Sequence, residues 1–446
     1  MNSSIEFINH ASCIISGRGI SILSDPWYFG DAFNKGWNLL YENDEQSITD
    51  LLDRTSYIWI SHEHPDHFSI PFFKKFAKQI IKNSITVLFQ DTKDKRVISF
   101  LKSLSIQSVE LKPGNKLFLE NDFSVTCIKD GFYDSALLVN NAGEKILNLN
   151  DCEITSPKRA NQVHAITGDV DILLTQFSYA AWKGGVANEQ WRKVAAQEKL
   201  ETIELQIRIF KPKKLIPFAS YMYFSNKENF YLNDSSNKPE VLLSLDQTTT
   251  EIIIMKPGDC LAENAKINIS EAIQFWQSKY NKLSTRELNQ YTIIDKKVLL
   301  DSYSKYCKRI SEKNSIIFMK FLRFISPMPI FSKVSIKLSD LDICYEFDYL
   351  SQTINETYSN PQLSMSSNSL NFIFQNSFGF DTLTVNGCFE EESQNGFLGS
   401  SKTLAIENLN NMGFKISPLI ILNLNLILLF LKRVFKVKNR LKFNQK

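Results

Sequence analysis

The sequence has little that would mark a secreted or membrane-spanning protein. Its seven cysteines are scattered, with no two within three residues of each other, which argues against a disulfide framework and favours a reducing compartment. The first 16 residues lack a basic segment and a long apolar run, so they do not resemble a signal peptide. The longest apolar stretch, 419–431, is 13 residues long and contains two asparagines, whereas a membrane span needs about 20 residues. We therefore expect a cytoplasmic protein.

An excess of one charge is also missing. Among the 446 residues, 51 Lys and Arg face 48 Asp and Glu, and this net charge of +3 is too small to predict a nucleic-acid partner. The small basic excess lies in the tail, because residues 432–446 contain seven Lys or Arg and no acid. A solvated basic end is the usual structure of such a charge run. Contact of the apolar-then-basic tail with an anionic membrane surface is the alternative, which would make the protein membrane-peripheral.

Glycine is scarce relative to phenylalanine, 16 against 33, as expected for a chain with a well-packed core. Helical spacing of apolar residues predicts helices over 71–83 and 189–210. Short apolar or alternating runs predict strands over 56–61, 84–90, 169–177 and 213–220, and hairpins over 15–26 and 136–151. Strands that alternate with helices indicate a layered α/β domain.

The pattern changes after this domain. We predict a first domain over 1–265, a helical connector over 266–330, a small α+β domain over 331–415 and an apolar-then-basic tail over 416–446. Within the small domain, 333–339, 343–350 and 381–390 have strand-like sequences.

Histidine is rare, and its distribution is the main functional signal. Three of the five histidines fall within six residues, in the pattern His62-x-His64-x-Asp66-His67, directly after the predicted strand 56–61. A tight loop at a strand end lets alternate side chains converge on one point. Imidazole and carboxylate ligands suit zinc or iron better than magnesium or calcium. The sequence therefore predicts a site for one or two transition-metal ions.

This HxHxDH motif after an apolar strand resembles the signature of the metallo-β-lactamase fold, an αββα sandwich. The Asp25-Pro26 turn matches the strand-end turn of the lactonase-like branches. The resemblance is closest to the CMP-N-acetylneuraminate hydroxylase family, in its domain after the Rieske centre. It rests on five stretches, which occur in order: DPWYFGDAFNKGWNLL (25–40), YIWISHEHPDHFSIPFFKKF (57–76), YDSALLVNNAGEKILNLNDC (133–152), IPFASYMYF (216–224) and KPGDC (256–260).

The resemblance also implies further metal ligands. The fold normally supplies a histidine before the hairpin, and here Asp134, or alternatively Asp130, stands at that position. The aspartate after the hairpin matches Asp151, which in the fold bridges two metals. The last histidine of the fold has no counterpart, because Ser220 stands near its place. One implied set is His62, His64, Asp134 and Asp151, and the other is Asp66, His67 and Asp151.

The remaining residues receive weaker interpretations. Asp25 is predicted either to hydrogen-bond a ligand histidine or to serve only as a strand-end turn. His10 is interpreted as a satisfied structural histidine, with a place in the pocket as the alternative. His164 is interpreted as a surface residue and Cys152 as part of the core.

Three functions are compatible with this site. The first is a metal-dependent hydrolase acting through metal-bound hydroxide on a sugar-nucleotide, glycan or phosphate-ester substrate, with Asp66 also serving as catalytic base. The second is an iron monooxygenase, as the hydroxylase resemblance implies. A Rieske cluster needs two Cys and two His, and no Cys-x-His or Cys-x-x-His pair occurs in these residues, so this function requires a separate electron donor. The third is a non-catalytic metal-binding module. The sequence favours the hydrolase, with zinc, iron or manganese as its metal.

Overall fold

The computed structural model describes residues 3–263 and 265–419. The chain divides into two compact units, one of Met1–Gln290 with Val385–Gly387 and one of Tyr291–Thr384 with Cys388–Lys446. Among the described residues, no helix combines the length and apolarity needed to cross a membrane. The predicted membrane contact of the apolar-then-basic tail concerns residues that lie almost entirely outside the described part of the chain.

Unit 1 contains two seven-stranded sheets, each part antiparallel and part parallel. The first has the order β16-β1-β2-β3-β5-β6-β7, in which β3, β5, β6 and β7 run parallel. Its strands are β1 (Ser4–Asn9), β2 (Ser12–Gly17), β3 (Ile20–Ser24), β5 (Tyr57–Ile60), β6 (Thr86–Gln90), β7 (Ser108–Leu111) and β16 (Cys260–Leu261).

The second sheet repeats this plan in the order β15-β13-β12-β11-β10-β9-β8, in which β11, β12, β13 and β15 run parallel. Its strands are β8 (Lys116–Glu120), β9 (Phe123–Asp130), β10 (Asp134–Asn141), β11 (Glu144–Asn148), β12 (Ile172–Gln176), β13 (Lys214–Phe218) and β15 (Glu251–Ile252). A separate pair joins β4 (Trp37–Leu39) to β14 (Met222–Phe224).

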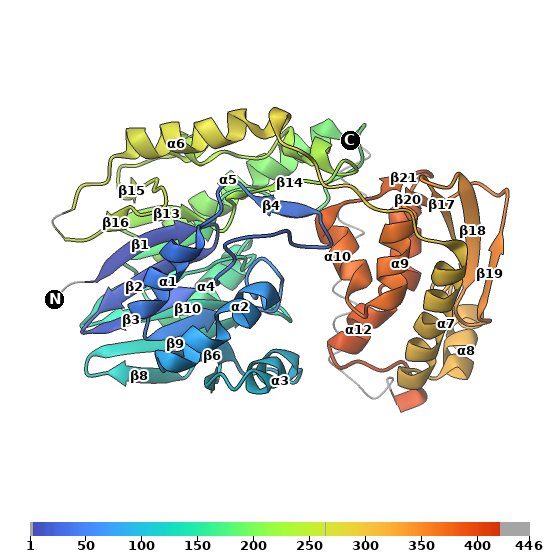
Figure 1. The fold of residues 1–446 in the computed structure, drawn as a ribbon, viewed down its shortest axis with the longest axis horizontal. Coiled ribbons are helices and arrows are strands. Elements are labelled where there is room, and N and C mark those ends of the chain that lie inside the picture. The colour runs from blue at the N-terminus through green and yellow to red at the C-terminus, as the bar shows by residue number, and fades with distance from the viewer. Residues whose placement is uncertain (1–2, 264, 420–446) are drawn as a thin grey trace. The chain divides into compact units, whose positions relative to one another are not determined.

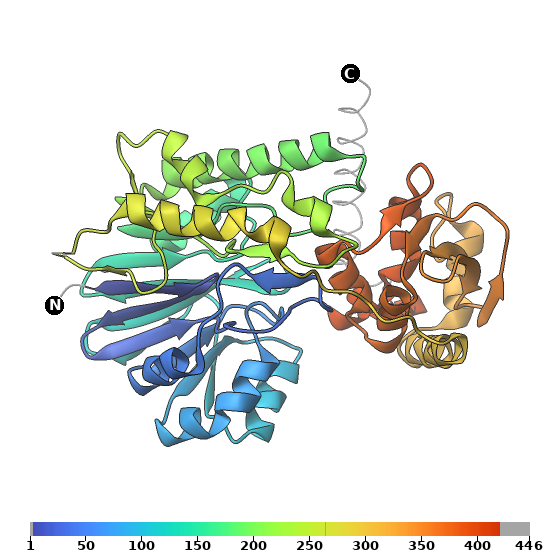
Figure 2. The ribbon, with the colours of Figure 1, turned by 45° about the horizontal axis from the view of Figure 1, so that its top comes forward.

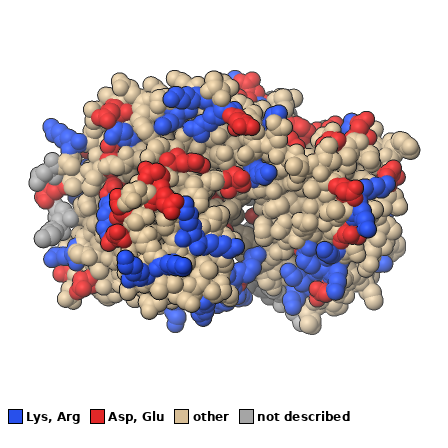
Figure 3. All heavy atoms as spheres, viewed as in Figure 1, with Lys and Arg blue, Asp and Glu red and all other residues tan. Residues whose placement is uncertain are grey.

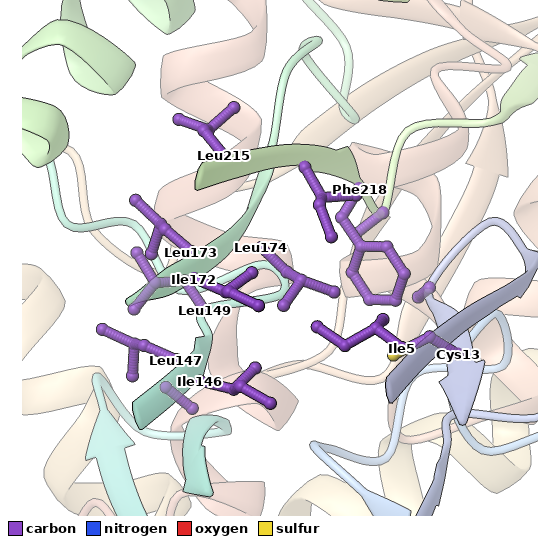
Figure 4. Close-up of a cluster of buried hydrophobic side chains, with 14 of the residues drawn as sticks. Ile5, Cys13, Ile146, Leu147, Leu149, Ile172, Leu173, Leu174, Leu215 and Phe218 are labelled. Atoms are coloured by element: carbon purple, nitrogen blue, oxygen red, sulfur yellow. The ribbon is translucent and has the colours of Figure 1, made fainter. Parts of the chain in front are cut away.

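The two sheets pack face to face because alternate residues of their strands are apolar. Cys13 and Ile15 of β2 face the core between the sheets, whereas Ile14 faces the helices on the outside. Figure 4 shows Ile5 and Cys13 of the first sheet meeting Leu174 and Phe218 of the second.

Helices cover both outer faces of unit 1, which gives four layers (Figures 1 and 2). The first sheet carries α1 (Glu45–Asp53), α2 (Ile70–Lys82) and α3 (Arg96–Ser103), and the second carries α4 (Pro157–Thr167) and α5 (Glu189–Phe210). The short helices η1 (Phe230–Asn233), η2 (Pro239–Ser244) and η3 (Leu283–Thr285) complete the unit with α6 (Ile269–Asn281). These layers are the predicted αββα sandwich, and α5 has the predicted bounds.

Helix α6 belongs to unit 1, although 266–330 was predicted to be a separate connector. Trp276 is fully buried, and its ring stacks on Tyr221 at a centroid distance of 4.1 Å. Its indole N–H donates to the carbonyl of Met255 over 2.8 Å. A large aromatic side chain in the core holds the whole helix against the unit, so the boundary lies after Gln290.

Unit 2 is an α+β unit with a five-stranded sheet in the order β19-β18-β17-β20-β21. Tyr303 and Phe374, from two of its helices, pack on Phe347 of the sheet. The strands are β17 (Val334–Leu338), β18 (Ile343–Asp348), β19 (Thr353–Glu356), β20 (Leu363–Met365) and β21 (Glu390–Glu391). The helices are α7 (Lys296–Lys313), α8 (Ile316–Ile325), α9 (Ser367–Gln375), α10 (Gly379–Asn386), α11 (Gly396–Leu404) and α12 (Ile406–Asn411).

The strand predicted over 381–390 is wrong, because most of it forms α10. The β-branched residues of this segment favoured a strand by propensity, but burial of Phe380 and Leu383 on one helical face overrides it. The helix ends at Asn386, where Gly387 adopts a φ of +68°.

Candidate metal centre

The topology of unit 1 brings six strand ends to one edge of the sandwich. The parallel strands β3 and β5 of one sheet and β11, β12 and β13 of the other all end there, and β10 begins there because it is antiparallel to β11. Loops at the carboxyl ends of parallel strands are the usual place for ligand sites in α/β folds. The motif His62–His67 follows β5, and Asp151 follows β11.

The motif loop is a tight turn that packs its side chains together. The N–H groups of His67 and Phe68 both donate to the carbonyl of His64, over 3.0 and 2.7 Å. This turn places Nε2 of His62 3.0 Å from Nδ1 of His64, and the rings of His62 and His67 lie 4.2 Å apart. His62, Asp66 and His67 are each at most 1% exposed. Four potential ligands therefore converge within one short loop.

Asp25, which follows β3, hydrogen-bonds to the motif loop. Its carboxylate accepts hydrogen bonds from the backbone N–H and hydroxyl of Ser61, over 2.8 and 2.7 Å, and from the amide of Asn150. Nδ1 of His67 lies 2.9 Å from the same carboxylate. The bond to Nδ1 turns Nε2 of His67 towards Asp66 and Asp151, each with its Oδ2 atom 3.3 Å away. Asp25 is thus placed as the predicted partner of a ligand histidine, in the arrangement that fixes ring orientation at metal sites.

Asp134, and not Asp130, reaches the histidines. Its Oδ1 atom lies 3.7 Å from Nε2 of His62. Asp130 is opposite Asp134 in the β9–β10 register but forms an ion pair with Arg159 over 2.7 Å. The guanidinium pairs with Asp130, so the geometry favours Asp134 between the two aspartates that the sequence left open.

Asp151 is supported by a chain of polar side chains that the sequence analysis missed. Nε2 of Gln176, at the end of β12, donates to Oδ1 of Asp151 over 3.0 Å. Nζ of Lys199 on α5 donates to the other side of the same amide, Oε1 of Gln176. Gln90 of β6 similarly donates to the carbonyl of Ser61, which ties the motif loop to the sheet. No local pattern marked these residues, because their partners are distant in sequence.

The electrostatics of the site are those of a crowded, buried cluster. Burial and the neighbouring charges of His67 and His64 hold the pKa of His62 well below its usual value. Burial opposes a charge on His67 as well, but the carboxylates of Asp66, Asp151 and Asp25 outweigh it and raise its pKa well above the usual value. Burial raises the pKa of Asp134 to about 7. The raised pKa values favour protons on His67 and Asp134, and a cation bound by these groups would displace those protons.

The donor set fits a transition metal. One ligand atom from each of His62, His67 and Asp151 lies within 4.8 Å of the others, and the same holds for His10, Asp66 and His67. Such spacings suit ligands that share an ion at ~2.0–2.2 Å. Oδ1 of Asp66 and Nε2 of His67 are buried without a hydrogen bond of acceptable geometry among the described residues. Buried polar atoms without partners are rare, and here both belong to the same cluster, in which Nε2 of His67 lies 3.3 Å from the other oxygen of Asp66.

The remaining predicted residues have other surroundings. His164 lies on α4 and pairs with Asp169 at the surface, and Cys152 is buried in the core, as predicted for each. The hydroxyl of Ser220 accepts the N–H groups of Phe177 and Ser178, so it is committed to the backbone. His10, predicted to be a satisfied structural residue, instead lies beside Asp66, with its Nδ1 atom unpartnered among the described residues.

Comparison with known proteins relates part of the chain to hydroxylases of a sugar nucleotide. No protein-family model matches the chain. Among curated proteins, the cytidine monophosphate-N-acetylneuraminic acid hydroxylases of zebrafish (Danio rerio) and mouse (Mus musculus) are each 25% identical to it, over 250 and 270 residues. These matches cover 52% and 57% of this chain and 41% and 45% of the relatives. The human protein, described as inactive, is 26% identical over 271 residues, which are 57% of this chain and 52% of that protein. The chain thus spans about half the length of these relatives.

Solved structures with a similar fold include hydrolases and a hydroxylase. CmlA, a diiron β-hydroxylase from Streptomyces venezuelae, matches with a TM-score of 0.41 and 15% identity over 58% of this chain and 54% of its own. The short form of human tRNase Z matches with a TM-score of 0.37 and 13% identity, over 59% of this chain and all of its own. The layered sheets and helices of unit 1 confirm the predicted fold class, and the curated matches confirm the resemblance to the CMP-N-acetylneuraminate hydroxylase family.

Proposed function

We propose that this chain is an iron-dependent hydroxylase that acts on a small carbohydrate-type substrate, with an N-acylated sugar nucleotide as the first candidate. The observation that carries the proposal is the carboxylate of Asp134, which lies 3.7 Å from Nε2 of His62, while the same Nε2 atom lies 3.0 Å from Nδ1 of His64. Two histidines with one carboxylate are the ligand set typical of non-haem Fe(II), whereas a third histidine would favour zinc. The curated relatives are named for hydroxylation of a sugar nucleotide, which supports both the reaction and the substrate class.

Bound iron would supply the redox chemistry, in which one C–H bond of the substrate becomes C–OH while dioxygen accepts two electrons and two protons and yields one water. The given residues contain no Rieske ligand set, so this proposal takes the two electrons from an iron–sulfur or flavin group outside these residues.

The residues of the chain have distinct roles in this proposal. His62, His64 and Asp134 hold one metal position, and Asp66 and His67 hold the other, with Asp151 beside both. Asp25 orients the ring of His67, and Gln176 orients the carboxylate of Asp151. Burial of the motif loop keeps bulk water from the ligands.

A metal-dependent hydrolase is the second candidate, because one further observation favours it. Oδ1 of Asp66 is buried and unpartnered among the described residues, and a carboxylate in this state is suited to accept a proton from an attacking water. In that case zinc would be the natural ion.

One incubation distinguishes the two candidates. The full chain is loaded with iron, supplied with a reduced iron–sulfur carrier, and given CMP-N-acetylneuraminic acid under isotopically labelled dioxygen. We expect a product heavier by one labelled oxygen atom. Zinc-loaded protein that releases the free nucleotide, with no labelled product from the iron form, would support the hydrolase and contradict the hydroxylase. The same incubation is carried out with Asp134→Asn, which removes the proposed carboxylate ligand. Asp130→Asn is its matched control, because Asp130 is the neighbouring aspartate and pairs with Arg159.

A further inference from the structure

The second metal position lacks the last histidine of the fold, and the structure shows what stands at that place. Strand β13 ends at Phe218, and Ser220 follows it. The Ser220 hydroxyl accepts two backbone N–H groups, over 3.1 and 3.2 Å, and so is occupied in holding the loop after β12. A serine in this role is a structural residue, which leaves the position short of a nitrogen ligand.

The turn between β1 and β2 fills this place from the other sheet. The carbonyl of His10 accepts the N–H of Ala219, the residue before Ser220, over 2.9 Å. His10 is thereby anchored against the end of β13, although it is more than 200 residues away in sequence. The anchoring brings an imidazole to the strand end from which the fold normally supplies one.

The side chain of His10 points into the cluster. Its Nε2 atom lies 3.4 Å from Oδ2 of Asp66, and that oxygen lies 3.3 Å from Nε2 of His67. The contact to Asp66 is longer than a usual hydrogen bond of a charged pair, which is about 2.7–2.9 Å. The rings of His10 and His67 lie 5.9 Å apart, and Trp27 packs edge-on against His10 from the other side.

The backbone at His10 is held in an uncommon conformation. Its φ is +27°, outside the regions that a residue with a Cβ atom prefers. The side chain of Asn9 compensates by accepting the His10 N–H over 2.9 Å. Strain of this kind persists where the surrounding structure requires it and is common at functional sites. Here it accompanies a buried histidine whose side chain makes one long polar contact among residues 3–263 and 265–419, so a purely structural role does not account for it.

We infer that His10 is a metal ligand, which completes the second position as His10, Asp66 and His67. This inference rests on the proposed function only in requiring that the site binds metal, and it holds for zinc or iron. Two imidazoles and a carboxylate then hold the second ion, with Asp151 between the two positions. The chain would accordingly hold two ions with comparable ligand sets, rather than one tight ion and one weak one.

The direct test uses the small number of histidines. The full chain, without a histidine tag and with isotope-labelled imidazole nitrogens, is loaded with spin-active cadmium alone. We expect cadmium–nitrogen coupling for four of the five histidines, namely 10, 62, 64 and 67, and none for His164. Coupling for His62, His64 and His67 but not for His10 would overturn the inference and leave the proposed metal centre intact. Absence of any coupling would contradict the metal centre itself.

A substitution provides the second test. His10→Gln retains most of the side-chain volume and is expected to bind one equivalent of zinc where the unchanged chain binds two. His164→Ala, at an exposed histidine, should still bind two. Circular dichroism checks that each variant is folded. If His10→Gln does not fold, the cadmium experiment on the unchanged chain shows by itself whether His10 binds metal. Two equivalents bound by folded His10→Gln with unchanged affinity would contradict the assignment.

Discussion

Nδ1 of His67 lies 2.9 Å from Oδ2 of Asp25, and both side chains are completely buried. This pair joins β3 to the motif loop, and it determines which nitrogen of His67 faces the metal centre. Because Asp25 also accepts two hydrogen bonds from Ser61, it fixes the loop as well as the ring.

Asp25→Asn therefore tests the orientation of His67. The substituted amide presents an N–H group where His67 requires an acceptor, so we expect metal affinity to fall about 10–100-fold, as is typical of changes behind a ligand histidine. Loss of the charged acceptor should also lower the free energy of unfolding by about 1.5–3 kcal/mol. Competition with a chelator measures the affinity, and Asp301→Asn on the exposed face of α7 is the control. Unchanged affinity in Asp25→Asn would show that the pair is structural only.

The Lys199–Gln176–Asp151 chain gives a second prediction. Lys199 donates to the amide oxygen of Gln176, which obliges the amide N–H to face Asp151. Gln176→Leu leaves Oδ1 of Asp151 without its donor, and we expect a loss of affinity of about 10-fold or more. Lys199→Met should have a smaller effect in the same direction, because the amide is then free to turn.

Lys193→Met is the matched control for this chain, since Lys193 lies on the same helix and pairs with Glu189 in solvent. Equal affinities for Lys193→Met and Gln176→Leu, measured by calorimetric titration with zinc, would contradict a role of Gln176 in metal binding.

The pH dependence of metal binding tests the carboxyl of Asp134. Burial raises its pKa to about 7 in the metal-free protein, so below that pH a proton must leave before the carboxylate can bind a cation. The contribution of this group to the affinity should therefore rise as the pH increases and level off above 7, with about a tenfold difference between pH 6 and pH 8. His67 releases a proton too, because its pKa is also raised, but it does so in every variant that retains it.

The contribution of Asp134 is isolated by comparing slopes. Titrations across this pH range should show a shallower dependence for Asp134→Asn than for the unchanged chain, whatever the difference in absolute affinity. Parallel slopes would mean that Asp134 does not exchange a proton for the metal.

The assignment of α6 to unit 1 predicts a large effect on stability. Trp276→Ala removes an aromatic side chain that stacks on Tyr221 and donates to Met255, and we expect the free energy of unfolding to fall by about 3–5 kcal/mol. Val194→Ala, at a half-exposed position of α5, should change it by less than about 0.5 kcal/mol. Chemical denaturation of both variants measures the difference. A small effect of Trp276→Ala would return α6 to the role of a loosely attached connector.

The sequence predicted those parts of the site whose residues are close together along the chain. The side chains of His62–His67 are brought together by one strand end and one turn, so their convergence can be predicted from a short segment. Helix 189–210 can be predicted from the spacing of its own apolar residues. The sequence favoured Asp134 and kept Asp130 as an alternative, because both precede the predicted hairpin 136–151, and the ion pair of Asp130 with Arg159 now separates them.

Contacts between distant segments could not be predicted in this way. His10 meets Asp66 across 56 residues, and Gln176 meets Asp151 across 25 residues and a change of strand. Both contacts arise from the order of strands in two sheets, which a local pattern does not encode. The prediction of a strand over 381–390 was wrong although it used only local sequence, because burial of one helical face overrides the local strand propensity.

The metal content of the protein as purified is the decisive measurement for the proposed iron centre. The full chain is prepared without a histidine tag and without added metal, and its ions are measured by mass spectrometry beside those of His64→Ala, Asp134→Ala and the control His164→Ala. We predict iron in an amount that approaches the two ions expected per chain, retained in His164→Ala and reduced by about half in both other variants. Zinc that is lost in His64→Ala but retained in Asp134→Ala would contradict the two-histidine, one-carboxylate iron centre and favour the hydrolase. A chain that binds no metal under aerobic or anaerobic purification would contradict both enzymatic proposals.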